Sequence, residues 1–268
     1  MKETMLVNVY FDYIIVAIFG LIIGSFLNVI ILRFDDLRSV IKTRSHCPEC
    51  KKQLHWYDLF PFFSFVLLAG KCRFCKKPIS VQYPLVELAT ALIFALLFWK
   101  FGFSLEFAVL LIISSILMVV LTYDILHFLI ADFLIWLSIG LWVIYLVVDY
   151  FFIQQSLPII LSSLYGGLAL GGFLGLIVLV SWEKWMGIGD IKLGFLLGAI
   201  SFWPNVLLAT FAAFALGSVI SLALIFSRKK TMKDMVPFAP FLIIGGYVAI
   251  FWGDQIIKWY LNSLGMGS

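Results

Sequence analysis

Apolar residues return in long runs along almost the whole chain. Eight runs hold at most one charged residue each, at 12–32, 85–99, 104–123, 126–148, 157–181, 191–203, 206–227 and 238–257. A helix needs about 20 mostly apolar residues to cross a bilayer, and most of these runs approach or exceed that length. Open sheets are excluded inside lipid, because every backbone donor and acceptor there needs a partner within the protein. The pattern therefore predicts an all-α polytopic membrane protein with about eight transmembrane helices.

Polar residues interrupt this pattern at length only once, at about 33–83, between the first and second runs. We expect three parts: a first transmembrane segment at 1–33, a small polar module at 34–83, and a seven-helix core at 84–268. The sixth run gives the weakest signal, because the stretch "FWPN" at 202–205 ends it early. No internal repeat is apparent along the chain.

Composition agrees with a membrane protein. The chain is 63% hydrophobic and 13% charged, with a mean hydropathy of +1.09, whereas about a quarter of the residues of soluble domains are charged. A lone secretory signal peptide does not explain this composition, since apolar runs keep returning after the first one.

The positions of Lys and Arg indicate how the chain is oriented. If the helices alternate in direction, 16 of the 19 cationic residues fall on one side of the membrane. They are Arg33, Arg38, Lys42, Arg44, Lys51, Lys52, Lys71, Arg73, Lys76, Lys77, Lys184, Lys192, Arg228, Lys229, Lys230 and Lys233. Cytosolic loops are rich in Lys and Arg. We therefore expect a multi-pass protein of the plasma (inner) membrane, with a cytosolic polar module and both termini extracytoplasmic.

The same rule accounts for the net charge of +4. The positive residues lie in the connecting segments where the rule places them. Membrane lipid is therefore the expected surrounding, and nucleic acid is not an expected partner.

The polar module holds the only four cysteines, as two C-x-x-C pairs: Cys47, Cys50, Cys72 and Cys75. Two such pairs supply four thiolates, the ligand set of a tetrahedral structural zinc site. Disulfides are disfavoured because the charge pattern puts the module in a reducing compartment, and a redox-active pair remains an alternative. We predict a structural zinc site with these four cysteines as ligands, and with His46 and His55 as solvated neighbours.

Three aspartates and one glutamate near the ends of the apolar runs are candidates for function: Asp124, Asp132, Asp190 and Glu87. Ionisable groups at membrane depth are costly and are functional candidates by default. Asp190 has an alternative role as a helix N-cap after "GIG". Asp124 either closes the third helix or caps the fourth, and Asp132 lies at or inside the fourth.

Asp124 and Asp190 on separate helices at one depth favour aspartyl proteolysis. Two neighbouring carboxyls do not both ionise easily, so one activates water while the other donates a proton to the peptide carbonyl. Gly187 and Gly189 let a substrate backbone approach closely, and Lys192 is expected to support the site. A transporter whose aspartates bind protons or cations needs acidic groups near the bilayer midplane, and the predicted topology places both aspartates near one face.

The chain resembles the bacterial type IV prepilin peptidases, which are GxGD-type membrane aspartyl proteases. The matching stretches are "GSFLNVIILR" (24–33), "HCPEC" (46–50), "CRFC" (72–75), "ISVQYPLVELATA" (79–91), "DILHFLIAD" (124–132), "GIGDIKLG" (187–194) and "VPFAPFL" (236–242). The resemblance covers nearly the whole chain. Seven motifs in this order, with a cysteine module after the first helix, are highly specific.

The resemblance implies a bifunctional enzyme acting on prepilins and pseudopilins at the cytosolic membrane face. It implies that Asp124 and Asp190 cleave the leader peptide and that zinc binds the four cysteines. The new N-terminal residue would then be methylated from S-adenosylmethionine. The methyl-transfer half is tied to the N-terminal region, which makes Asn28, Arg33 and Glu87 its candidate residues.

Two positions depart from the family pattern: Ala131 stands where proline is usual, and Ala239 where glycine is usual. A peptidase without methyl transfer and a related GxGD protease with another substrate remain alternatives. The sequence does not indicate which prepilins are processed, where S-adenosylmethionine binds, or the oligomeric state.

Overall fold

The computed structural model describes residues 2–36, 38, 45–153, 156–229, 231, 234, 236–263 and 265, with side chains from residue 10 onward except at residue 35. Lys42, Arg44, Lys230 and Lys233, which contribute to the charge pattern, lie outside these residues, as does the side chain of Lys2.

The regular secondary structure of the described residues is helical, apart from two isolated β-bridges in the polar module. Its long helices are α1 (Lys2–Leu32), α4 (Gln82–Phe101), α5 (Leu105–His127), α6 (Asp132–Val148), α7 (Leu157–Ser181), α8 (Ile188–Ser201), α9 (Val206–Phe226) and α10 (Ala239–Ser263). The short elements are η1 (Phe34–Asp36), η2 (Trp56–Leu59), α3 (Phe63–Leu67) and the π-helical turn η3 (Asp149–Ile153). The prediction of an all-α fold with a small module after the first helix is confirmed.

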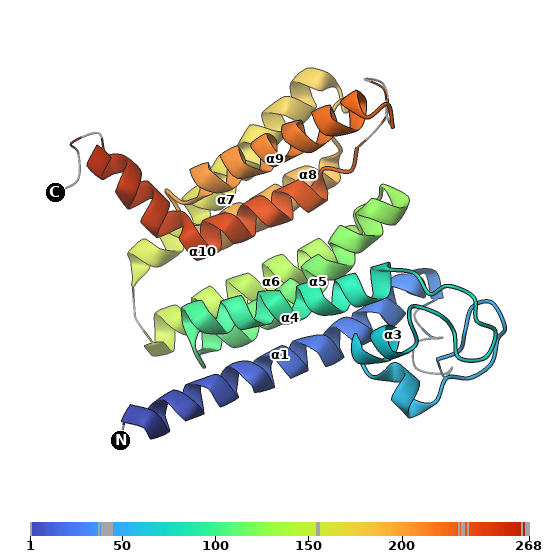
Figure 1. Cartoon of the computed structure of the whole chain (residues 1–268). Helices are drawn as coiled ribbons and strands as arrows, with labels where there is room; N and C mark the ends of the chain where they lie inside the picture. Colours follow the sequence, from blue (N-terminus) through green and yellow to red (C-terminus); the bar gives the residue numbers. More distant parts are fainter. Residues whose placement is uncertain are drawn as a thin grey trace. The chain divides into compact units, whose positions relative to one another are not determined.

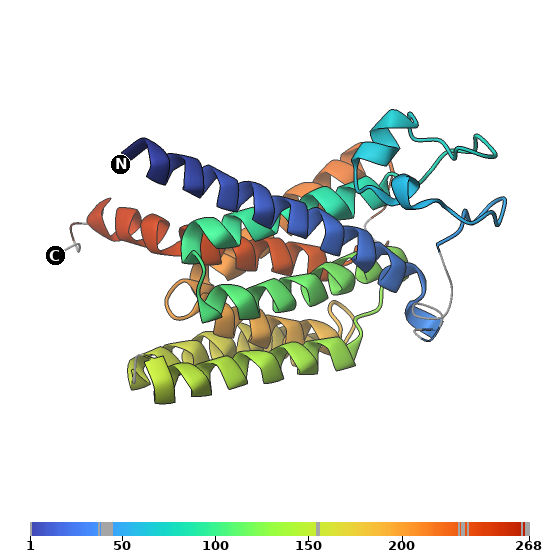
Figure 2. The same ribbon diagram turned by 90° about the horizontal axis from the view of Figure 1, so that it is seen from below.

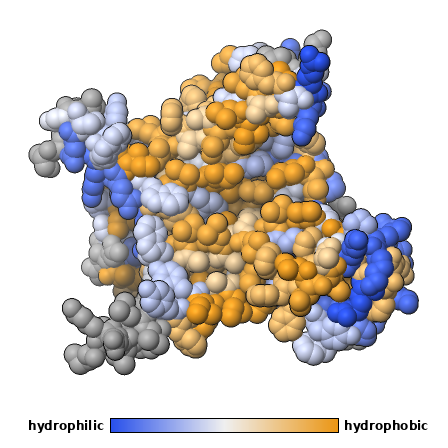
Figure 3. Space-filling view, viewed as in Figure 1, coloured by the Kyte–Doolittle hydropathy of each residue, from blue (hydrophilic) through white to orange (hydrophobic). Residues whose placement is uncertain are grey.

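Seven of these helices are long and apolar enough to span a membrane. The helix that falls short is α8, whose 14 residues extend only about 21 Å, against a hydrocarbon thickness of about 30 Å. In Figure 3 hydrophobic side chains cover the middle of the helices, and hydrophilic ones gather toward their ends. The chain is a multi-pass membrane protein.

The fourth apolar run was predicted to begin at residue 126, and this boundary is wrong. The helix α5 continues to His127, and α6 begins only at Asp132. Phe128 between them has a left-handed φ of 56°, and its N–H donates to the carbonyl of Asp124 at 2.9 Å. A residue in the left-handed region ends a helix, as it does in a helix C-cap.

The chain divides into two compact units, Met1–Thr122 and Tyr123–Ser268. In the first unit, α1 and α4 run antiparallel and side by side (Figures 1 and 2). A Cβ on Gly24 would lie 2.7 Å from the Cα of Glu87, so only glycine permits this approach. One turn further along α1, the side-chain Nδ2 of Asn28 donates to the carbonyls of Gly24 at 3.3 Å and Tyr83 at 3.1 Å.

The second unit is built around α8. Nine of its fourteen residues are buried, and it packs against α6, α7, α9 and α10. Figure 1 shows α8 between α7 and α10. Because protein surrounds it, α8 does not need the length of a helix that faces lipid on its own.

Small residues bring α7 and α8 together. A Cβ on Gly198 would lie 2.3 Å from the carbonyl oxygen of Gly166, and one on Gly194 would lie 2.5 Å from Leu174 Cδ1. Glycines at such contacts let membrane helices approach until their backbones touch, which increases their packing energy.

We expect Gly198→Ala to lower the stability of the second unit by about 1–3 kcal/mol, because the new methyl group meets rigid backbone. Gly172→Ala on α7 is the matched control, since nothing lies within 4 Å of the added Cβ. Thermal unfolding in detergent should show a lower midpoint for the first variant only. Equal midpoints would contradict the close packing of α7 and α8.

Candidate active site and metal centre

Asp124 lies in the last turn of α5, which ends at His127. It does not cap α6, because that helix begins eight residues later, at Asp132. Of the two roles left open by the sequence, the structure therefore assigns Asp124 to the end of the third long helix. Asp124 is buried, with a relative exposure of 5%.

Asp190 lies in the first turn of α8 and is 7% exposed. Its Oδ2 accepts a hydrogen bond from the N–H of Gly187 at 3.2 Å, as the third residue of a capping box does. Asp190 therefore helps to cap α8, but from the third helical position; the N-cap itself is Gly187 and not Asp190 as the sequence suggested. This capping uses only one oxygen, because Oδ1 is buried without a hydrogen-bond partner among the described residues.

The two carboxylates lie close enough for their charges to interact. The N–H of Ala239, at the start of α10, donates a hydrogen bond to Asp124, whose Oδ2 has no partner among the residues that the structure describes. Buried polar atoms are normally satisfied, and each exception needs an explanation. The ends of α5, α8 and α10 thus bring together two acidic side chains, each with a buried oxygen that is not bonded to protein.

Asp132 and Lys192 form an ion pair between α6 and α8. The Nζ of Lys192 on α8 donates to Oδ2 of Asp132, the first residue of α6, at 2.5 Å. A Cβ on Gly189 would lie 3.0 Å from the Cβ of Ile130. The segment between α5 and α6 is therefore held against the start of α8 by a salt bridge and by a close packing contact.

The two glycines predicted to admit a substrate backbone have different surroundings. The space beside Gly189 is occupied by Ile130, whereas a Cβ on Gly187 would meet only Asp190 and Gly189, at 4.0 Å. Gly187 is also exposed. Of the two positions, Gly187 is the one that leaves room for another backbone to approach.

The four cysteines come together in the module. The sulfurs of Cys47, Cys50, Cys72 and Cys75 all lie within 4.8 Å of one another, and none forms a disulfide. Cys47 Sγ and Cys75 Sγ are 3.9 Å apart. Tetrahedral zinc with Zn–S bonds of about 2.3 Å separates its sulfurs by about 3.8 Å. The cluster therefore has the ligands and the size of a metal site.

The two halves of the module share one backbone pattern, a short repeat that the sequence analysis did not identify. The N–H of Cys47 donates to the carbonyl of Lys52 at 2.9 Å, and that of Cys72 to the carbonyl of Lys77 at 2.8 Å. The lysine before each acceptor has a left-handed φ, of 57° and 60°. The shared letters C-x-x-C-K-K carry this signal, but they span only six residues.

Hydrogen bonds in the module favour the thiolate form of one ligand. The backbone N–H of Cys75 lowers the pKa of Cys72 to about 7, against the opposing effect of burial. Lys77 also forms an ion pair with Glu49, which lowers the pKa of that carboxyl and links the two halves. His46 and His55 are exposed and outside the cluster, as predicted.

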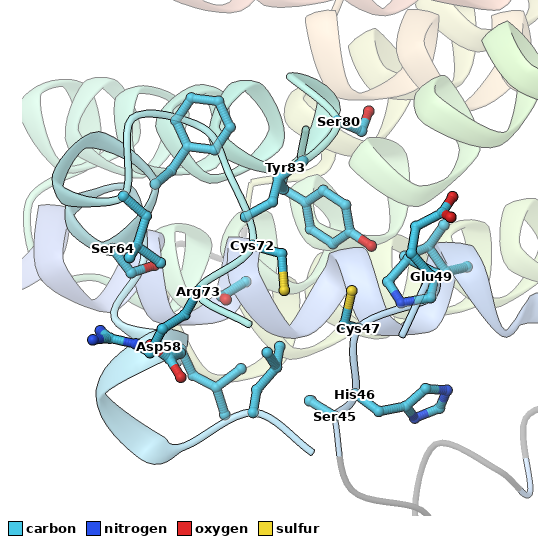
Figure 4. A pocket seen from close by; sticks show the side chains of 18 of the residues that line it. Ser45, His46, Cys47, Glu49, Asp58, Ser64, Cys72, Arg73, Ser80 and Tyr83 are labelled. Atoms are coloured by element: carbon cyan, nitrogen blue, oxygen red, sulfur yellow. Dashed lines mark hydrogen bonds and ion pairs between the residues drawn. The ribbon is translucent and has the colours of Figure 1, made fainter. Parts of the chain in front are cut away.

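The three candidate residues for methyl transfer lie in the first unit, near one cavity of about 470 Å³. Arg33 and Glu87 line this cavity, and Asn28 connects the two helices that form part of its wall. Figure 4 shows the cavity with Cys47, Cys72 and Tyr83 on one side and Asp58 and Arg73 on another. The sequence did not indicate this cavity, because its walls come from α1, the module and the start of α4, which only the fold brings together.

Comparisons with known proteins point to one family. Residues 18–101 match the family described as Bacterial Peptidase A24 N-terminal domain. The chain is 32% identical to a prepilin leader peptidase/N-methyltransferase of Legionella pneumophila, over 94% of this chain and 96% of the relative. The proteins of the same name from Pseudomonas aeruginosa and Bacillus subtilis are 30% and 34% identical, over 92% of this chain and 92% and 97% of their own lengths. No solved structure matches the chain.

Proposed function

Because the chain belongs to the prepilin leader peptidase/N-methyltransferase family, we propose that it cleaves the leader peptide of prepilins or pseudopilins and methylates the N-terminal residue so exposed. The peptidase part of this proposal rests on two buried carboxylates, Asp124 and Asp190. Each has one oxygen that forms no hydrogen bond with any described residue. An aspartyl mechanism needs two such groups close together and no cofactor.

In this proposal the dyad holds one proton between its two carboxyls. The ionised carboxylate takes a proton from water as the water oxygen attacks the peptide carbonyl carbon. The protonated carboxyl donates to the carbonyl oxygen, which gives a neutral gem-diol. Collapse of the diol breaks the C–N bond, the nitrogen receives a proton, and the leader departs with a new carboxyl group.

The N–H of Gly187 holds one oxygen of Asp190, and the N–H of Ala239 bonds to Asp124. Both donors belong to the backbone at the start of a helix, so they fix the carboxyls without moving when charge develops. Preorganised donors of this kind lower the cost of reaching a charged transition state. The exposed side of Gly187 is where we expect the substrate backbone to approach.

For the second reaction we propose S-adenosylmethionine as the methyl donor. The lone pair of the new α-amino nitrogen attacks the methyl carbon. The carbon–sulfur bond breaks, and its electron pair remains on sulfur as a neutral thioether. The nitrogen loses one proton, so the products are the N-methylated chain and S-adenosylhomocysteine.

We further propose that the cysteine cluster holds zinc and that both the cluster and the dyad face the cytosol. The sulfur geometry supports zinc, since tetrahedral thiolate sites are typical of that metal. The distribution of Lys and Arg supports the sidedness. A cytosolic site also suits a substrate whose basic leader remains in the cytosol, as the sequence resemblance implies.

The proposal is tested with the purified full-length chain in liposomes, a prepilin, and S-adenosylmethionine labelled on the methyl group. We expect a shortened pilin that carries the label at its N-terminus. A shortened pilin without label would reduce the function to that of a peptidase. An uncut prepilin would reject the proposal.

The ion pair of Asp132 and Lys192 supports a further prediction about the peptidase. We expect Lys192→Ala to slow cleavage by up to about tenfold, because the segment that packs against Gly189 loses its anchor. The effect on stability should be small, since a partly exposed pair contributes about 0–1 kcal/mol. Cleavage rates at saturating prepilin, together with unfolding midpoints, measure both effects.

Lys184→Ala is the matched control, because Lys184 is an exposed lysine of the segment before α8. The exchanged pair Asp132→Lys with Lys192→Asp should recover part of the lost rate. A full rate in Lys192→Ala, or no recovery in the exchanged pair, would contradict a positioning role.

A further inference from the structure

The cavity in the first unit has three walls of different chemistry. One face of α1 contributes Ser25 and Val29, which share a side of the helix because they lie four residues apart, and Arg33 follows directly after the helix, with its N–H donating to the carbonyl of Val29. The start of α4 contributes Tyr83 and Glu87, at the same spacing. The cysteine module closes the remaining side. With a volume of about 470 Å³, the cavity is in the range of small-molecule sites, about 300–1,000 Å³.

Glu87 places a buried carboxylate at this cavity, with a relative exposure of 6%. The N–H of Phe62 donates to its Oε2 at 2.7 Å, and the side chain of Ser25 also bonds to it. A carboxylate has about four acceptor positions, so these two bonds leave capacity for a ligand. A buried anion is stable only with charged or hydrogen-bonding partners, and a cationic ligand group would complete that set.

Three other side chains of the wall suit a polar, planar ligand. Gln82 has a buried Nε2 with no hydrogen-bond partner among the described residues, so one donor at the cavity is unused. Tyr83 and Phe65 add aromatic surface, on which a planar heterocycle can stack. Among the other charged side chains of the wall, Asp58 pairs with Arg73 and Glu49 with Lys77, and Arg33 lies just after the end of α1.

We propose that this cavity binds the methyl donor, S-adenosylmethionine. The donor is a small molecule with a sulfonium cation, an ammonium group and a planar adenine, which match the anionic, polar and aromatic parts of the wall. This inference rests on the proposed methyl transfer and is independent of the peptidase dyad. Glu87 supplies the negative charge for a donor cation, and the hydrogen bonds that it makes to Phe62 and Ser25 keep it in place.

A purely structural Glu87, which only holds the backbone of Phe62, is the competing interpretation. Phe62 has a left-handed φ of 57°, a conformation that costs about 1–3 kcal/mol and needs support. Glu87→Gln separates the two, because the amide oxygen still accepts from Phe62 while the negative charge is lost. A structural role predicts that this variant retains the affinity for the donor.

The experiment measures the equilibrium binding of S-adenosylmethionine to the full chain in nanodiscs by calorimetry, with no prepilin present. Glu87→Gln should weaken binding by about tenfold or more, as expected for the loss of a charged contact. Val29→Trp should also abolish most binding, because it fills the cavity. Ile22→Trp is the matched control, since Ile22 is an exposed residue of α1 that does not line the cavity.

Prepilin cleavage without the methyl donor is measured on the same preparations and reports whether each variant is folded. Active Glu87→Gln with weakened binding supports the cavity as the donor site. Unchanged affinity in both cavity variants, or no binding to the unsubstituted chain, overturns it. Displacement of the donor by a synthetic basic leader peptide would also overturn it, by assigning the cavity to the substrate. If no preparation cleaves the prepilin but the donor still binds, the result counts against the peptidase and not against this site.

Discussion

Replacing either Asp124 or Asp190 by asparagine is expected to leave a prepilin essentially uncut. Asparagine keeps the size of the side chain but can neither take a proton from water nor hold the shared proton of the dyad. Loss of general acid–base catalysis lowers rates by about 100-fold to 10,000-fold. Initial rates of leader removal in liposomes, followed by mass spectrometry, measure this loss.

Asp254→Asn is the matched control for these variants. Asp254 is an exposed carboxylate of α10 that accepts from Nδ2 of Asn205 at 2.7 Å, a bond that the amide oxygen of asparagine can keep. This variant should cleave at the normal rate. Normal cleavage by either Asp124→Asn or Asp190→Asn would remove that residue from the catalytic pair.

The second large effect that we expect is the loss of zinc from the cysteine cluster. We expect the purified chain to carry about one zinc ion and Cys72→Ser to carry almost none, because three thiolates do not complete the tetrahedral site. Zinc binding to small thiolate modules is worth about 10–16 kcal/mol, so the module should unfold when the metal leaves. Elemental analysis gives the zinc content, and limited proteolysis within residues 45–80 reports unfolding.

His46→Ala and His55→Ala are the controls for the zinc site. Both residues lie in the module beside the cysteine pairs but outside the sulfur cluster, so both variants should keep their zinc. A chain without metal and with four free thiols would contradict the zinc assignment. So would Cys72→Ser with a full zinc content.

The apolar pattern located most helices because local residues mark their ends. The run at 157–181 coincides with α7, which has proline in its first turn and ends where Trp182 takes a left-handed conformation. The gap between α5 and α6 was missed for the opposite reason. The segment that contains Phe128 is apolar, and neither glycine nor proline marks the turn there.

The sequence did not indicate the structural role of α8. Its 14 residues read as a short, weak membrane span, yet this helix is the centre of the second unit. The helix holds this central position through contacts with four other helices, and no pattern of neighbouring residues in the sequence predicts such contacts. The same contacts bring the start of α8 to the end of α5, more than 60 residues earlier in the chain.

Of the candidate site residues, the cysteines were predictable from their spacing alone, because each pair lies in one tight turn. Asp132 was left without a role, and its ion pair with Lys192 depends on the packing of α6 against α8. The surroundings of Glu87 were also not predictable. Its contact with Phe62 depends on how the cysteine module folds back on α4.

A double-mutant cycle shows whether Asp124 and Asp190 act as one catalytic unit. Residual cleavage is measured in each asparagine variant and in the chain that carries both substitutions. Members of one unit are not additive, so the double variant should retain about the same residual rate as each single one. A double variant slowed by the product of the two single effects would mean that the two aspartates act independently, and would rule out a catalytic dyad.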